Sequence, residues 1–142
     1  MNASEVIEAV ECLFPKNAWA TLRELKESTG LDRRAIDLFA MSVFPSSGLK
    51  RYAIEVKVSR SDFTRELRNY EKSRPWVEGL CNRFAFAAQE GIIHEEDLPP
   101  WASLIVIRDG TAYWAVKREL SPKDPPLTFL ASILRRQSRS EK

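Results

Sequence analysis

The sequence predicts a mixed α/β layered domain, and three patterns carry this prediction. Residues 51–59 alternate between apolar and polar side chains, as a half-buried β-strand does. Asp109-Gly110 is a strong hairpin signal between two short apolar runs. Apolar residues among the first fourteen positions recur at the spacing of one helix face. We therefore expect strands and helices to be combined in one domain covering residues 1–142.

The elements of the N-terminal half follow from local signals. Residues 3–14 are predicted to form a helix that Asn2 caps together with Glu5. Residues 18–25 fit either a strand or a helix, and a strand is favoured. The apolar run 35–43 is separated from strand 51–59 only by turn residues, so we expect these two strands to pair.

The C-terminal half contains helices, then strands, then a last helix. Ser61-Asp62 is predicted to cap a helix that runs to about Tyr70, and Pro75 to begin a short helix over 76–81. Three further strands are expected at 83–88, 103–107 and 111–116, and a C-terminal helix over about 126–138. The core of the domain is accordingly expected over about residues 3–120.

The composition restricts the class of protein. The chain has 142 residues, 44% of them hydrophobic, which suits one globular domain with its own core. No apolar run approaches the ~18 residues needed to span a bilayer, and the N-terminus has no basic segment typical of a signal peptide. Two cysteines, Cys12 and Cys81, form no metal-binding pattern and are expected to be reduced thiols. We therefore expect a cytoplasmic protein with no membrane partner.

Basic residues are concentrated in one part of the chain. The net charge is only +2, but residues 50–74 hold eight lysines and arginines against four acids. Such a region can contact a polyanion such as nucleic acid, or it can be an ordinary solvated face. The composition alone leaves both interpretations open.

Charged residues inside apolar strands are the most informative feature. Asp37 lies within the apolar run 35–41, and Glu55 and Lys57 lie on one face of strand 51–59, about 7 Å apart. Burying a charge costs several kcal/mol unless it is paired or binds a metal. One explanation is a structural ion pair or a solvated sheet edge. The other is a Mg²⁺ site, with Lys57 beside a metal-bound water or a phosphate.

These residues resemble a known signature. Asp37 followed by Glu55-Val56-Lys57 on a second strand is similar to the D…(D/E)-x-K signature of the PD-(D/E)XK phosphodiesterase superfamily. The longer string of residues 54–63, IEVKVSRSDF, resembles a segment of the MmcB-related and phage-encoded branch of that superfamily. The resemblance runs from about Arg34 to Ile107, which is roughly half of the chain.

The resemblance implies a fold and a metal site. The expected fold is a restriction-endonuclease-like single domain, with a mixed central sheet flanked by helices. Asp37, Glu55 and the backbone carbonyl of Val56 would hold Mg²⁺ or Mn²⁺, and Lys57 would be the motif lysine. The family often adds a glutamate from its first helix, and Glu8 is the candidate favoured over Glu5 and Glu11.

Two departures from the family pattern concern positions near this site. Ile36 stands where the superfamily has the proline of its name. Glu66-Leu67-Arg68-Asn69-Tyr70 stands where the RecB-like branch has Gln-x-x-x-Tyr, so Glu66 is not given that glutamine's role.

A basic segment next to the motif is predicted to contact DNA phosphates. Ser59 and Arg60 stand near a helix start, where backbone N–H groups and a guanidinium can hold a phosphate. Lys72 and Arg74 would extend the same surface. The alternative is that the serines and Asp62 only cap the helix.

The sequence therefore predicts a metal-dependent DNA endo- or exonuclease that acts in DNA repair, recombination or phage DNA processing. Asp37, Glu55 and Lys57 are its predicted catalytic residues and DNA its partner. A homodimer is a further expectation, because such a small core often needs a second copy to cut both strands of a duplex. The main alternative is a non-catalytic nucleic-acid-binding module that keeps the fold, and a third is a purely structural α/β domain with an ion-paired sheet.

Overall fold

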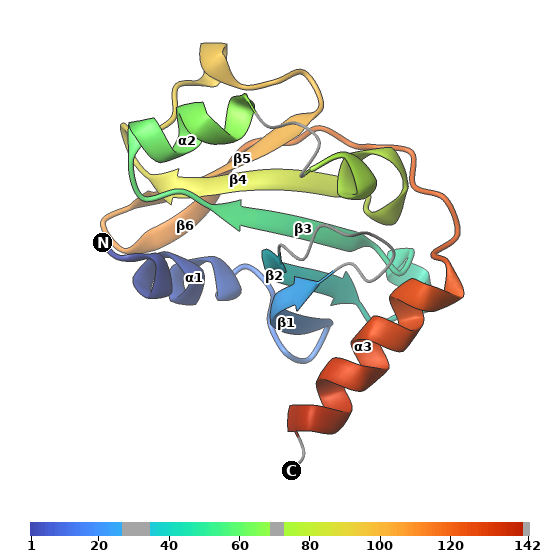
Figure 1. The fold of residues 1–142 in the computed structure, drawn as a ribbon. Coiled ribbons are helices and arrows are strands. Elements are labelled where there is room, and N and C mark those ends of the chain that lie inside the picture. The colour runs from blue at the N-terminus through green and yellow to red at the C-terminus, as the bar shows by residue number, and fades with distance from the viewer. Residues whose placement is uncertain (27–34, 69–72, 141–142) are drawn as a thin grey trace.

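Six strands form one sheet in the order in which they occur along the chain (Figure 1). The computed structural model describes residues 1–26, 35–68 and 73–140. The predicted strands are confirmed, with bounds that differ by up to three residues. The strands are β1 (Trp19–Lys26), β2 (Ala35–Ser42), β3 (Arg51–Val56), β4 (Arg83–Gln89), β5 (Ala102–Arg108) and β6 (Thr111–Val116).

The sheet is mixed. Strands β1, β2 and β3 pair antiparallel, which confirms the predicted pairing of β2 with β3, and Leu38 lies opposite Ile54. Strands β3, β4 and β5 pair parallel, and β6 returns antiparallel through the predicted hairpin. Asp109 (φ 52°) and Gly110 (φ 78°) both take positive φ, as a two-residue hairpin turn of type I′ requires.

The parallel pairs need crossover connections, and these place helices over one face of the sheet. The β3–β4 crossover contains α2 (Arg60–Leu67) and a single π-helical turn, η3 (Trp76–Leu80). Short 3₁₀ turns occupy the β2–β3 and β4–β5 connections, at η1 (Pro45–Ser47) and η4 (Glu95–Asp97). A last helix, α3 (Leu127–Ser140), confirms the predicted C-terminal helix.

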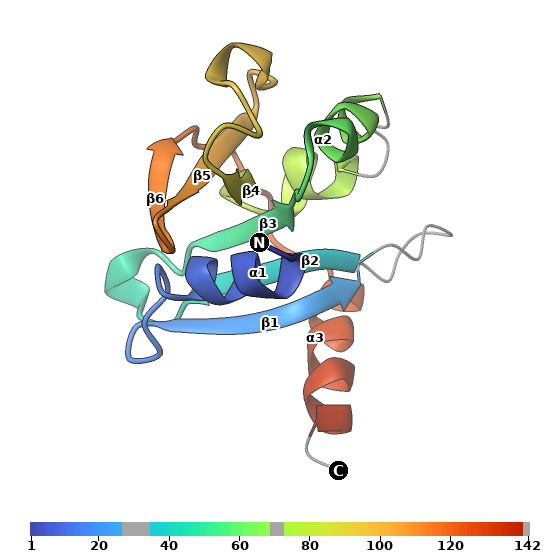
Figure 2. The same cartoon turned by 90° about the vertical axis from the view of Figure 1, so that its left-hand side faces the viewer.

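Helices cover both faces of the sheet, which gives three layers (Figure 2). On one face, α1 (Ala3–Glu11) packs on small and aliphatic side chains, among them Ala85 and Ala87 of β4. On the other face, α2, η3 and α3 enclose an aromatic core whose members include Phe63, Phe86 and Phe129. Within the described ranges, no helix is both long enough and apolar enough to cross a membrane.

Helices α1 and α2 differ from the prediction in where they end and where they are capped. Asn2 and Glu5 form the predicted capping box, but α1 ends at Glu11 rather than at residue 14. The prediction that Ser61-Asp62 caps the second helix is wrong, because Ser59 is the N-cap. Its hydroxyl accepts a hydrogen bond from the backbone N–H of Asp62 at 3.1 Å. Asp62 therefore lies in the first turn, where its negative charge is favourable to the helix dipole.

The regular alternation of side chains breaks where β1 and β2 lie next to each other at Glu24 and Asp37. Glu24 takes φ 55°, in the left-handed region that non-glycine residues rarely adopt. Ile36 and Phe39 consequently pack into the same core, although they are three residues apart on one strand. Asp37 lies at this break in the alternation, and it is the first residue of the candidate site.

The two cysteines differ in environment, and we predict that only one reacts in the folded protein. Cys81 is fully buried, its thiol donates to the carbonyl of Trp76, and burial raises its pKa to about 12. Because the thiolate is the nucleophile, Cys81 should resist alkylation at pH 8.5, whereas the exposed Cys12 should react. Mass spectrometry after iodoacetamide treatment should show one label per native chain and two per unfolded chain. Rapid native labelling of Cys81 would contradict its burial.

Candidate functional site

Asp37 joins β2 to β3 through its side chain. Its Oδ2 accepts a hydrogen bond of 2.7 Å from the backbone N–H of Val56, which lies nineteen residues later in the chain. Backbone pairing between these strands runs only from Met41–Arg51 to Leu38–Ile54, so this carboxylate continues the connection where the ladder ends. The hydrogen bond holds the aspartate against the Glu55-Val56-Lys57 segment.

Glu55 and Lys57 share the face of β3 that α2 covers. Ala53 packs on this face, and strand alternation places Glu55 and Lys57 with it, while Val56 packs under α1. Only 5% of Glu55 and 6% of Lys57 are exposed. The next register step beyond Leu38–Ile54 sets Asp37 opposite Glu55. The structure therefore brings together the three residues that the sequence selected as catalytic.

Helix α2 supplies the counter-charge for Lys57. The Lys57 Nζ donates to Oε1 of Glu66 at 3.1 Å and lies 3.9 Å from Oδ1 of Asp62. Glu66 is itself buried, with 4% of its side chain exposed, and Asp62 is half-buried.

Sequence reasoning missed the role of Glu66. It compared this position with a glutamine in another branch and did not consider it as the partner of Lys57. The available signal was helical spacing, since Glu66 follows the buried Phe63 by three residues and so shares its inward face.

Two carboxylates contact Lys57, those of Asp62 and Glu66. The carboxylate of Asp37 and the buried Glu55 lie on the adjoining strands β2 and β3. Within the described residues, no group of three or more histidine, cysteine, aspartate or glutamate side chains gathers in a way that would hold a metal ion. Any metal held by Asp37 and Glu55 must therefore keep several waters, which is the usual habit of Mg²⁺.

The glutamates of α1 lie apart from Asp37 and Glu55. Glu5 is used in the capping box, and Glu11 bonds the Arg23 guanidinium through both oxygens, at 3.0 and 2.5 Å. This hydrogen bonding raises the pKa of Arg23. Glu8 is exposed on α1, which covers the face opposite to Lys57. The structure thus does not bring Glu8 together with Asp37 and Glu55.

Three of the four predicted phosphate-binding residues lie in the described part of the chain, and each makes a contact within the chain. Ser59 caps α2, the alternative that the sequence left open. Arg60 donates to Asp97 at 2.6 Å while half of its side chain stays exposed. Arg74 is exposed and lies 3.9 Å from Glu78, and Lys72 lies outside the described residues.

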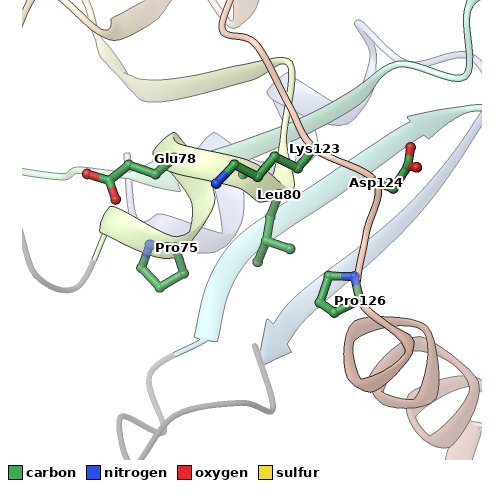
Figure 3. Close-up of a pocket in the computed structure, with 7 residues that line it drawn as sticks. Pro75, Glu78, Leu80, Lys123, Asp124 and Pro126 are labelled. Carbon is green, nitrogen blue, oxygen red and sulfur yellow. The ribbon is translucent and has the colours of Figure 1, made fainter.

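A cavity of about 250 Å³ lies between η3 and the segment that leads into α3 (Figure 3). Glu78, Leu80 and Lys123 contribute to its walls, and none of the site carboxylates does. Arg51 ties the two walls, because its guanidinium donates to the carbonyls of Leu80 and Lys123 at 2.8 Å each. Burial lowers the pKa of Arg51. The Arg51 hydrogen bonds hold the segment before α3 against η3, and the cavity between them is separate from the site around Asp37.

Comparison with known proteins identifies one similar structure. No family model matches the chain, and a search for curated relatives gave no match. A protein of unknown function from Silicibacter pomeroyi has a similar solved structure, with a TM-score of 0.70 and 18% sequence identity. The match covers 99% of this chain and 87% of the other chain. At this identity the likeness supports the α/β fold alone.

We predict that the Lys57–Glu66 pair is coupled in stability. Glu66→Leu removes the hydrogen-bonded carboxylate of a buried ammonium, which keeps only the longer 3.9 Å contact to the half-buried Asp62, and should lower the free energy of unfolding by about 3 kcal/mol. The double variant Lys57→Met/Glu66→Leu removes both members of the pair, so its stability should return to within about 1 kcal/mol of the parent. Urea unfolding of the parent, both single variants and the double variant measures this coupling. Additive losses in the double variant would show that the pair is not a unit.

Proposed function

We propose that this chain is a divalent-metal-dependent deoxyribonuclease of the PD-(D/E)XK superfamily, with a restriction-endonuclease-like fold. One observation carries the proposal: the carboxylate of Asp37 is hydrogen-bonded to the backbone N–H between Glu55 and Lys57. Asp37 and the Glu55–Lys57 segment, which are separated along the chain in the family signature, are thus neighbours in the fold. The mixed sheet with helices on both faces is also what the resemblance implies.

The donor set fits a hard divalent cation. Asp37 and Glu55 would hold Mg²⁺ or Mn²⁺, and the Val56 carbonyl is a further candidate ligand. Oδ2 of Asp37 is oriented by the Val56 N–H, which fixes the carboxylate without using all of its lone pairs. Such an ion, when bound, lowers the pKa of a coordinated water and offsets negative charge on the phosphate.

Lys57 would act beside this position as a fixed positive group. Its ammonium has three donors, and the contacts to Glu66 and Asp62 leave it capacity for a further hydrogen bond. Lys57 can therefore orient the attacking water or stabilise the extra charge of the pentavalent phosphate. Glu66 is a positioning residue, since it acts on the reaction only through Lys57.

DNA is the proposed substrate, and the exposed part of Arg60 together with Arg74 would contact its backbone. Phosphate contacts fix register and read no sequence, so no cleavage site preference is proposed. Both cysteines are free thiols, which suits action in the reducing cytoplasm, in DNA repair, recombination or phage DNA processing.

Nuclease assays test the proposal directly. Labelled single-stranded, duplex, nicked and branched DNA should be cleaved with Mg²⁺ or Mn²⁺ and left intact with EDTA. Asp37→Asn and Glu55→Gln should each lower the rate by about 100-fold or more, because each removes a charge at the reacting centre. Lys57→Met/Glu66→Leu should be equally inactive although it stays folded.

The matched control for these variants is Glu96→Gln, which removes an exposed acid of η4. Parental cleavage by Asp37→Asn would refute the site. DNA binding without cleavage of any substrate would favour the non-catalytic binding module.

Metal binding has a readout that does not depend on activity. A ligand at ten times its dissociation constant stabilises the folded state by about 1.4 kcal/mol, so Mg²⁺ should raise the melting temperature of the parent. Asp37→Asn keeps an oxygen for the Val56 N–H but loses the charge, and its melting temperature should not respond. Glu96→Gln should respond as the parent does. An equal shift in Asp37→Asn would place the ion elsewhere.

A further inference from the structure

Helix α3 carries two apolar faces, and the sheet uses only one. Phe129 is 1% exposed in the aromatic core, and Ile133 packs beside it. A second stripe remains in solvent, with Leu127 82% exposed, Leu130 41% and Leu134 70%. At 100° per residue these three leucines lie within about 60° of one another around the helix axis.

The position of α3 makes this stripe accessible. The helix contacts β1 at the edge of the sheet and crosses the direction of that strand, and its C-terminal part projects away from the sheet in both views (Figures 1 and 2). Single exposed leucines are ordinary on a protein surface, but a continuous stripe on a projecting helix is typical of an interaction surface.

We propose that the α3 stripe (Leu127, Leu130, Ala131 and Leu134) is the interface between two copies of this chain, which pair their α3 helices antiparallel about a two-fold axis. The stripe is symmetric about its midpoint between residues 130 and 131. Antiparallel pairing sets Leu127 against Leu134 of the second copy and Leu130 against Ala131. Every contact then occurs twice, as an isologous interface requires.

Charge favours the antiparallel arrangement over the parallel one. The three arginines of α3 all lie in its C-terminal half: Arg135 and Arg139 are exposed, and Arg136 donates to the carbonyl of Arg23 at 3.3 Å. Parallel pairing would bring the four exposed arginines of two copies to the same end of the helix pair. Antiparallel pairing separates them and places each set near the start of the other helix, where Asp124 supplies a carboxylate.

The size of the surface sets the expected strength. A helix of 14 residues is about 21 Å long, so the pair buries less than the roughly 800 Å² per copy of a stable interface. The association is therefore weak and depends on concentration. This proposal does not depend on the nuclease assignment.

Sedimentation equilibrium of the full chain tests the association. Between about 5 and 500 µM the mass should rise from 16.3 kDa toward twice that value. Leu134→Asp should weaken dimerisation by about tenfold or more, since it places a charge in the stripe. Thr128→Asp adds the same charge on the exposed flank of α3 and should leave dimerisation intact. A constant monomer mass, or an unchanged Leu134→Asp dimer, would overturn the proposal.

Disulfide trapping tests the pairing itself. In a Cys12→Ser background, a mixture of Leu127→Cys and Leu134→Cys chains should form the mixed disulfide in preference to either same-variant disulfide. Preferred same-variant disulfides would overturn the antiparallel arrangement.

Disulfide trapping also distinguishes pairing of two α3 helices from a second way in which two copies could associate. A groove of about 550 Å³ beside β6, with Glu95 and Glu96 on its walls, is another surface that could receive a basic helix of a second copy. Dimerisation that is sensitive to Leu134→Asp but gives none of these disulfides would point to that groove and overturn helix pairing.

Discussion

The hydrogen bond between the Asp37 carboxylate and the Val56 amide is the constraint on which the site depends. It forms where the side-chain alternation of β2 breaks, opposite the left-handed residue Glu24, and where the backbone ladder between β2 and β3 ends. The Asp37 side chain thus extends the connection between the two strands past their last backbone pair.

Buried charge is the second organising feature. Lys57 and Glu66 come from a strand and from the crossover helix that follows it, so their contact fixes how α2 sits on the sheet. Loss of either partner would leave a buried charge without its hydrogen-bonded counter-charge, at a cost in desolvation free energy. The polar site and the aromatic core around Phe63 therefore belong to the same packing arrangement.

The sequence was sufficient to predict the strands, the final helix and the proximity of Asp37 to the Glu55–Lys57 segment, because alternation and turn residues are local signals. It did not predict that Glu66 pairs with Lys57, since that contact depends on how α2 docks. It placed the cap of α2 at Ser61-Asp62, because Ser59 and Ser61 are chemically equivalent as caps and only the backbone path distinguishes them. The placement of Glu8 depended on which face α1 covers, and helix periodicity carries no such information.

The brevity of α2 has a consequence for the stability of the site over time. An isolated helix of eight residues is not stable in water, so α2 stays folded only while Phe63 remains packed against Phe86, whose ring centre lies 5.2 Å away. Local opening of this one helix would remove Asp62 and Glu66 from Lys57 together, while the six-stranded sheet stayed intact. The amide protons of α2 should therefore exchange with solvent as one cooperative unit, ahead of those in β3 and β4.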